Sequence, residues 1–313
     1  MEFGILFRED FIRVVHTFKE KRGASMNTNQ ILVQPGSKVN LDKYDPAFIG
    51  KFTDKEKCEV KLRSDIEKLS EYQEILYADN RYALLIIVQA MDAAGKDSII
   101  KHVMSGVNPQ GCRISSFKQP STEELRHDFL WRCVRELPPR GWIGIFNRSY
   151  YEEVLTVRVH PELLERQNLP ASLRGSDIWK NRFEDINCFE RYCVRNGIII
   201  LKYFLNVSRE EQKKRLLERL DKKEKHWKFS GQDIVERKYW QQYRRAYEEV
   251  LSRTSTTWAP WYVIPADHKW FTRIAVADSI VGTLDRLHLS YPRLTKEESQ
   301  RLQKTKKWLK EEG

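Results

Sequence analysis

The sequence predicts an α/β protein in which a parallel sheet is flanked by helices on both faces. Apolar runs of strand length alternate with helical segments of ten residues or more, a pattern typical of βαβ units. The first run, Tyr82–Val88, is apolar at every position, as expected for a strand in the middle of a covered parallel sheet. A loop containing Gly95-Lys96 then leads from this strand into a helix.

The predicted elements follow one another without a linker that would divide the chain. Residues 1–52 have scattered prolines and glycines and no sustained periodicity, so we expect an irregular leader there. A capping box at Thr53–Glu56 begins a helix that ends near Ala78. The predicted strands are Tyr82–Val88, Arg113–Phe117, Trp142–Phe146, Ile198–Val207 and Trp261–Ile264.

The remaining helices lie between and after these strands, within one block over residues 53–290. The charged tail at 291–313 is expected to be a solvated helix or a frayed end, with a basic binding tail as the alternative. Helices are predicted from Lys96 to Met104, after capping boxes at Ser121–Glu124 and Ser208–Glu211, from Asp177 to Gly197, from Asp233, and over Phe271–His288.

Composition limits the class of protein and of partner. The chain has 313 residues, 41% of them hydrophobic, and a net charge of +11, which excludes a disordered or collagen-like chain. No apolar run approaches the ~20 residues needed to cross a bilayer, and the N-terminus lacks the pattern of a secretory signal, so we expect a cytoplasmic protein. The positive charge implies nucleic acid, a membrane surface or a polyanionic substrate as partner.

The loop after the first strand has the pattern of a phosphate-binding loop. It fits GxxxxGK[ST] if Ala90 replaces the first glycine and Asp97 the Ser/Thr. Backbone N–H groups at the start of the helix, together with the charge of Lys96, can bind phosphate oxygens. A carboxylate at Asp92 would repel phosphate unless a metal lies between them, and Mg²⁺ is the natural bridge. The alternative is an ordinary turn between a strand and a helix.

Two further segments can complete such a site. Asn147 and Arg148 follow strand Trp142–Phe146, where phosphate-loop enzymes place a metal-directed residue and where an arginine can neutralise phosphoryl charge. The segment Ser208–Ser230 contains nine Lys/Arg against five Asp/Glu and suits a basic lid over phosphates. The alternatives are a helix N-terminus rich in Ser and Glu, and a solvated charged helix face.

Four segments together resemble the polyphosphate kinase 2 family over roughly Lys51–Leu289. They are residues 90–111, 144–154, 218–230 and 259–280, in this order. The resemblance implies a phosphate-loop kinase fold, similar to that of thymidylate kinase, with a helical lid at about 208–232. It also implies Mg²⁺-dependent phosphoryl transfer between inorganic polyphosphate and AMP, ADP or ATP, in a homo-oligomer that binds neither a membrane nor nucleic acid.

The resemblance also assigns roles to individual residues. Catalysis falls to Asp92, which would hold the metal, with Lys96, Asn147 and Arg148. Phosphate binding falls to Ala93, Ala94, Gly95, Lys96, Asp97, Arg132, Arg215, Arg219, Lys225 and Lys228. Nucleotide binding falls to Asn108, Arg113, Lys118, Glu124, His127 and Asp128.

The form of the second motif, Asn-Arg-Ser-x-Tyr-Glu at 147–152, resembles the branch that accepts AMP as well as ADP. Gln89 and Ala90 depart from the family's usual Glu and Gly. Residues 1–25 lie upstream of Met26 and outside the resemblance, so we expect them to be dispensable. An ATP-dependent nucleotide kinase and a basic nucleic-acid-binding protein remain the alternative functions.

Overall fold

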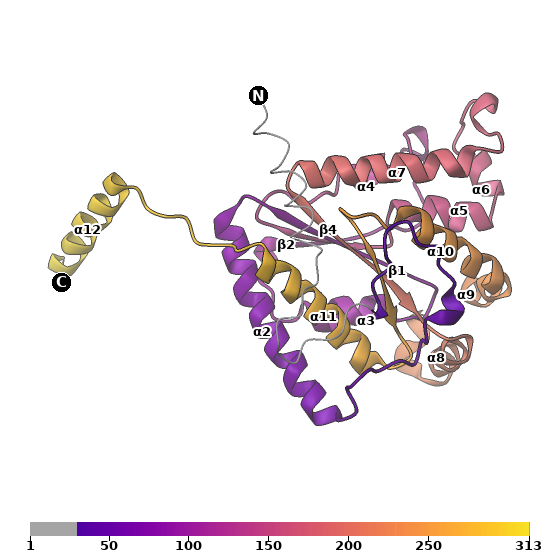
Figure 1. The fold of residues 1–313 in the computed structure, drawn as a ribbon, viewed down its shortest axis with the longest axis horizontal. Helices are drawn as coiled ribbons and strands as arrows, with labels where there is room; N and C mark the ends of the chain where they lie inside the picture. Colours follow the sequence, from indigo (N-terminus) through magenta and orange to yellow (C-terminus); the bar gives the residue numbers. More distant parts are fainter. Residues whose placement is uncertain (1–29, 229, 313) are drawn as a thin grey trace.

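A five-stranded sheet forms the centre of the computed structural model, which describes residues 30–228 and 230–312. All neighbouring strands are parallel, in the order β2-β3-β1-β4-β5 (Figure 1). The predicted α/β class is confirmed, and each predicted strand is found within two residues of its expected bounds. The strands are β1 (Ala83–Ala90), β2 (Cys112–Ser116), β3 (Ile143–Asn147), β4 (Ile198–Asn206) and β5 (Trp261–Pro265).

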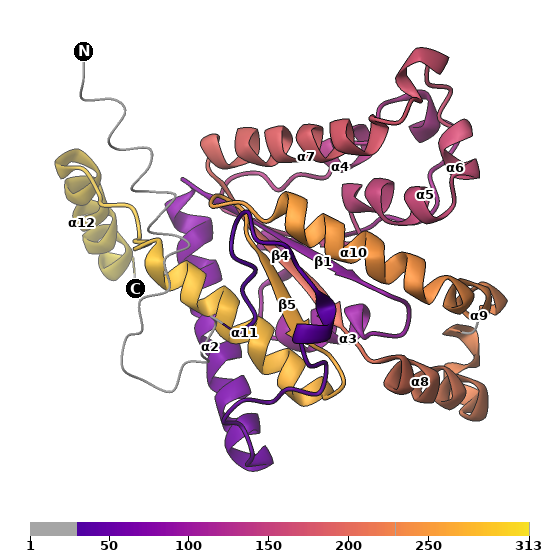
Figure 2. The ribbon, with the colours of Figure 1, turned by 45° about the vertical axis from the view of Figure 1, so that its right-hand side comes forward.

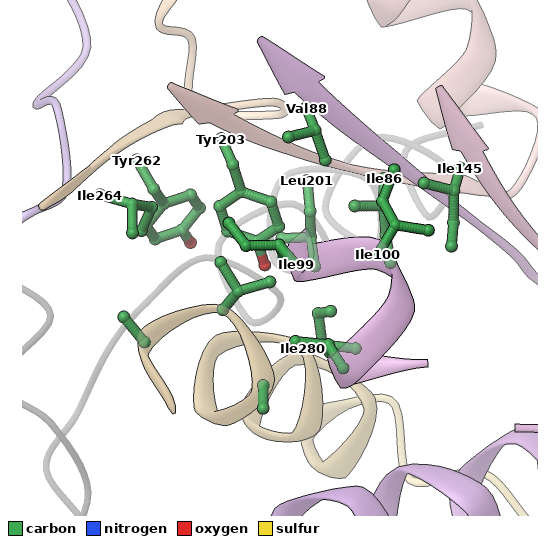
Figure 3. Packing of buried hydrophobic residues seen from close by; sticks show 14 of the residues in the cluster. Ile86, Val88, Ile99, Ile100, Ile145, Leu201, Tyr203, Tyr262, Ile264 and Ile280 are labelled. Atoms are coloured by element: carbon green, nitrogen blue, oxygen red, sulfur yellow. The ribbon is translucent and has the colours of Figure 1, made fainter. Parts of the chain in front are cut away.

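Helices cover both faces of this sheet (Figure 2). One face packs on α2 (Lys55–Asp79), α3 (Lys96–Val103) and α11 (Lys269–Arg286). Figure 3 shows the apolar layer between them, in which side chains of β1, β3, β4 and β5 meet Ile99, Ile100 and Ile280. The other face packs on α7 (Ile178–Arg195) and α10 (Trp240–Thr254). Burial on both sides explains why β1 is apolar throughout.

The remaining elements are short, and two predicted helices are wrong in extent. The capping box at Ser121 and Glu124 forms, with Glu124 N–H donating to Ser121 Oγ at 3.2 Å, but only a 3-10 turn follows at Glu124–Arg126. The helix expected from Asp233 is interrupted by a 3-10 turn, η8 (Arg237–Tyr239). Other short helices are α4 (Trp131–Val134), α5 (Thr156–Val159), α6 (Glu162–Glu165), η7 (Lys223–Lys228) and α9 (Gly231–Glu236), and α8 (Arg209–Asp221) is longer.

The segments before and after the block of residues 53–290 differ from each other. Residues 30–52 are largely irregular, as predicted, yet Ile31 and Val33 are buried and Val33 N–H donates to Trp261 O of β5 at 2.9 Å. Helix α12 (Lys296–Glu311) projects from the body at the end of an extended segment (Figure 1). The prediction about residues 1–25 lies outside the described residues. None of the described helices is both long and apolar enough to cross a membrane.

A fully buried ion pair joins β4 to α7. Lys202 Nζ lies 2.6 Å from Glu190 Oε2 and also donates to Tyr151 Oη and to Thr254 O. Glu190 Oε1 accepts from the hydroxyls of Tyr150 and Tyr151, at 2.9 and 2.7 Å. Every donor of the ammonium is therefore used, which is the condition under which a charge can be buried.

We expect Lys202→Met to destabilise the protein by about 3–5 kcal/mol, because it leaves the Glu190 carboxylate buried without a counter-charge. Urea unfolding followed by tryptophan fluorescence measures the loss. The double variant Lys202→Met/Glu190→Gln removes both charges and keeps an acceptor for the tyrosine hydroxyls, so we expect it to be more stable than the single variant. A single variant as stable as the parent would contradict this account.

Candidate active site

The phosphate loop joins β1 to α3 at the carboxyl edge of the sheet. Gly95 precedes the first residue of α3 with φ at 115°, and Ala93 also has a left-handed backbone, with φ at 60°. Lys96 begins the helix, and its Nζ donates to Ala90 O at 2.9 Å. Burial lowers the pKa of Lys96, and the charge of Asp92 opposes that shift. The loop thus closes on itself around the lysine, as a phosphate-binding loop does.

The two sequence motifs meet because β1 and β3 are hydrogen-bonded neighbours. Val88 is paired with Asn147, so the residues that follow these positions lie side by side. Arg148 Nη2 lies 3.1 Å from Asp92 Oδ1, and Arg148 has a left-handed backbone with φ at 65°. Such a conformation is costly for a non-glycine residue and occurs mainly at functional sites. The expectation that the second motif lies beside the loop is confirmed.

Asn147 is bound to the other carboxylate of the loop. Its Nδ2 donates to Asp97 Oδ1 at 2.8 Å. Asp97 is exposed, and it stands where GxxxxGK[ST] has a hydroxyl. The amide therefore links the end of β3 to the first turn of α3.

Glu152 is a site residue that the sequence reasoning missed. Its Oε2 lies 3.7 Å from Arg148 Nη1, its Oε1 accepts from Gln89 Nε2 at 3.2 Å, and Thr156 Oγ1 donates to it at 2.7 Å. The negative charge of Glu152 raises the pKa of Arg148, and the charge of Asp92 adds a smaller effect in the same direction. The guanidinium is thereby held between two carboxylates. The available signal was its place in the Asn-Arg-Ser-x-Tyr-Glu motif.

A cavity of about 330 Å³ opens beside Arg148. Its wall includes Gln232 of α9, so the C-terminal end of the predicted lid reaches this cavity. Five of the predicted binding residues line it, namely Lys118, Glu124, His127, Asp128 and Arg132. Glu153, Arg166 and Gln167 also line it and were not predicted. Glu153 directly follows the second motif, whereas no strand end or motif marks the segment of Arg166 and Gln167.

The carboxylates in this wall already have partners. Glu153 is buried, and it accepts from Arg182 Nε at 3.0 Å and from Gln167 Nε2 at 2.7 Å. Burial raises the pKa of Glu153. Glu124 closes its own turn by accepting from Ser121 N–H at 2.6 Å. These groups shape the wall, whereas Lys118 and His127 are exposed toward solvent.

Two predicted nucleotide-binding residues lie elsewhere. Asn108 caps the 3-10 turn η3 (Pro109–Gly111), which precedes β2. Arg113 is the second residue of β2 and lies 3.9 Å from Glu136. Because the strands are parallel, both are nearer the amino edge of the sheet, and the phosphate loop is at the carboxyl edge. The structure therefore does not bring Asn108 or Arg113 into the cavity.

The predicted lid cations have different environments. Arg215, predicted to bind phosphate, is buried, and all five of its N–H groups have protein acceptors. Arg219 is paired with Asp233 of α9 at 2.7 Å. Lys225 is paired with Glu218 at 2.8 Å. Lys228 ends η7, and its side chain lies outside the described part.

The family model of polyphosphate kinase 2 matches residues 52–290. This chain belongs to the polyphosphate kinase 2 family. The structure superposes on a polyphosphate kinase 2 from Arthrobacter aurescens TC1 with a TM-score of 0.78 and 39% identity, over 86% of this chain and 94% of that one. The phosphate-loop kinase fold predicted from the sequence is thus confirmed.

Two curated relatives are similar to this chain over nearly their whole length. An ADP-polyphosphate phosphotransferase of Rhodopseudomonas palustris is 49% identical, over 86% of this chain and 94% of that protein. An AMP/ADP-polyphosphate phosphotransferase of Meiothermus ruber is 41% identical, over 83% of this chain and 94% of that protein. The names of these two relatives differ in the nucleotide they state.

Proposed function

We propose that this polyphosphate kinase 2 family member transfers a phosphoryl group between inorganic polyphosphate and AMP or ADP. One observation carries the proposal: the Asp92–Arg148 pair stands between a phosphate loop and a cavity of about 330 Å³. A phosphate held by the loop and a nucleotide held in the cavity would meet at this pair. Phosphoryl transfer needs this alignment, together with cancellation of charge, more than it needs covalent chemistry.

The acceptor nucleotide is assigned to the cavity. Lys118 and Arg132 supply positive charge to its wall, and Arg132 is anchored by donating to Lys118 O at 2.7 Å. His127 stacks on Trp131 with ring centroids 3.9 Å apart, so an aromatic pair lies at the rim. The form of the second motif favours AMP as well as ADP as acceptor.

The donor is assigned to the loop and the basic lid. Backbone N–H groups of Ala93, Gly95 and the first turn of α3 would bind its terminal phosphates. Arg219 and Lys225 would bind the following phosphates once they leave Asp233 and Glu218. Lys228 is the third lid cation predicted to bind there. A chain of anionic phosphates accounts for the net charge of +11 as well as nucleic acid would.

Mg²⁺ is the cofactor that the loop fits. The described residues contain no cluster of three or more acidic, His or Cys side chains that could hold a metal. Mg²⁺ does not require one, because it is commonly held by one or two carboxylates, water and substrate phosphates. Asp92 would supply the carboxylate, and the bound ion would neutralise charge on the phosphates. Assembly into a homo-oligomer stays a prediction of the family resemblance.

The identity of the donor decides between this proposal and its alternatives. With AMP as acceptor, we expect ADP and ATP to form from inorganic polyphosphate, and to form much more slowly when ATP replaces polyphosphate as donor. Chromatographic separation of the nucleotides measures both rates. Transfer from ATP alone would indicate an ATP-dependent nucleotide kinase. Tight binding of nucleic acid that polyphosphate cannot displace would indicate a nucleic-acid-binding protein.

Asp92 and Asn147 test the metal site in opposite directions. We expect Asp92→Asn to lower turnover on the order of 10²-fold or more, the effect of removing one electrostatic contact to a transition state. We expect Asn147→Asp to lower the Mg²⁺ concentration needed for half-maximal rate, because it adds a carboxylate beside Asp97. Mg²⁺ titrations at saturating polyphosphate measure both. Normal turnover in Asp92→Asn would refute the metal assignment.

Lys118 and Arg113 form a matched pair for the acceptor site. Both are exposed cations near β2, but only Lys118 lines the cavity. We expect Lys118→Ala to weaken AMP binding about 10-fold, the effect of losing one charged hydrogen bond. Arg113→Ala is expected to bind AMP as the parent does. Calorimetric titration with AMP measures both, and equal losses would place the nucleotide elsewhere.

A further inference from the structure

Side chains from the first two turns of α8 donate hydrogen bonds to backbone carbonyls of the phosphate loop. Gln212 Nε2 donates to Asp92 O at 3.0 Å. One turn later, Arg215 Nη1 donates to Ala94 O at 2.7 Å and to Ala93 O at 3.3 Å. Two side chains therefore hold three consecutive carbonyl oxygens of the loop. Both side chains are buried.

These bonds determine where the N–H groups of the loop point. In a trans peptide the N–H of one residue is directed opposite to the C=O of the residue before it. Carbonyls of residues 92–94 that face α8 therefore turn the N–H groups of Ala93, Ala94 and Gly95 away from it. Of these three N–H groups, only that of Ala94 has an acceptor within the described part of the chain, namely Met91 O at 3.3 Å. Such outward-turned N–H groups form an anion-binding nest.

The loop needs external support to keep this shape. Ala93 has φ at 60°, a left-handed conformation that an L-residue with a β-carbon adopts at a cost. A strained conformation persists only where surrounding contacts determine it. The carbonyls on either side of this torsion are both held, Asp92 O by Gln212 and Ala93 O by Arg215, and the same guanidinium also holds Ala94 O.

That guanidinium is itself fixed to the protein body. Arg215 Nη2 donates to Ala266 O at 2.6 Å and to Asp267 O at 3.0 Å, just beyond β5, and its Nε donates to Glu211 Oε1 at 2.9 Å. Gln212 Oε1 accepts from Arg237 Nη1 at 2.7 Å. The base of the predicted lid is thus tied to β5, to the loop and to the end of α9.

We propose that Gln212 and Arg215 are positioning residues that hold the phosphate loop in its anion-binding shape, and that Arg215 does not itself bind phosphate. The substrate concerned is the terminal phosphate of the donor, so the proposal rests on the proposed function. It follows that α8 up to Arg215 stays fixed to the loop. Any closing movement of the lid takes place beyond it, in the part that carries Arg219.

Steady-state kinetics with polyphosphate separates positioning from binding. We expect Arg215→Lys and Gln212→Met to lower kcat on the order of 10²-fold, the cost of a misplaced reacting group, with the KM for polyphosphate nearly unchanged. The control is Glu210→Gln, which removes a charge from the exposed side of the same helix and is expected to match the parent. A raised KM with an unchanged kcat in Arg215→Lys would show that Arg215 binds phosphate directly.

Hydrogen exchange gives a readout that does not depend on activity. We expect faster amide exchange in the peptide covering residues 90–97 of Arg215→Lys and Gln212→Met, and unchanged exchange in β4. Adding Ala93→Gly to Arg215→Lys should restore part of the turnover, because glycine adopts positive φ without strain. If residues 90–97 exchanged at the parent's rate in both variants, the positioning role of Gln212 and Arg215 would be overturned. A parent enzyme without transfer from polyphosphate would instead refute the proposed function and leave the exchange result standing.

Discussion

The site depends on the parallel pairing of β1 with β3 on one side and β4 on the other. Parallel strands bring all their carboxyl ends to one edge of the sheet, and polar loops that follow them meet there. Val88 pairs with Asn147 and with Tyr203, so the loop after β1 is flanked by the ends of both neighbours. The phosphate loop, the Asn147-Arg148 motif and the start of α8 therefore converge although the chain separates them widely.

Where these segments converge, positive side chains lie next to carboxylates, and this pairing reduces repulsion between like charges. Arg148 lies between the carboxylates of Asp92 and Glu152, at 3.1 and 3.7 Å. Arg219 is paired with Asp233, whose pKa is raised by burial and then by the charge of Asp92. Arg148 and Arg219 thus each have a carboxylate partner in this structure. Under the proposed function, a phosphate that binds these cations would replace their carboxylate partners.

The buried Lys202–Glu190 ion pair stabilises the segment that follows Arg148. Tyr150 and Tyr151 directly follow the Asn147-Arg148-Ser149 segment, and both hydroxyls donate to Glu190. The Lys202 ammonium binds the same carboxylate. This network fixes the backbone two residues after Arg148, where the left-handed conformation has to be held. A buried charge that costs desolvation therefore has a positional use next to the site.

The sequence alone determined the elements and the chemistry of single motifs. The apolar run of β1 and the Gly95-Lys96 start of α3 are local signals, since strand burial and helix initiation depend on neighbouring residues. The tertiary structure decided which of the predicted cations are buried and which partners they have. Arg215 and Arg219 are two predicted lid cations one helical turn apart. Arg215 is nevertheless buried against loop carbonyls, whereas Arg219 is paired with Asp233. Helical spacing says which side chains share a face, whereas burial and partners depend on segments distant in the chain, and no local pattern encodes those.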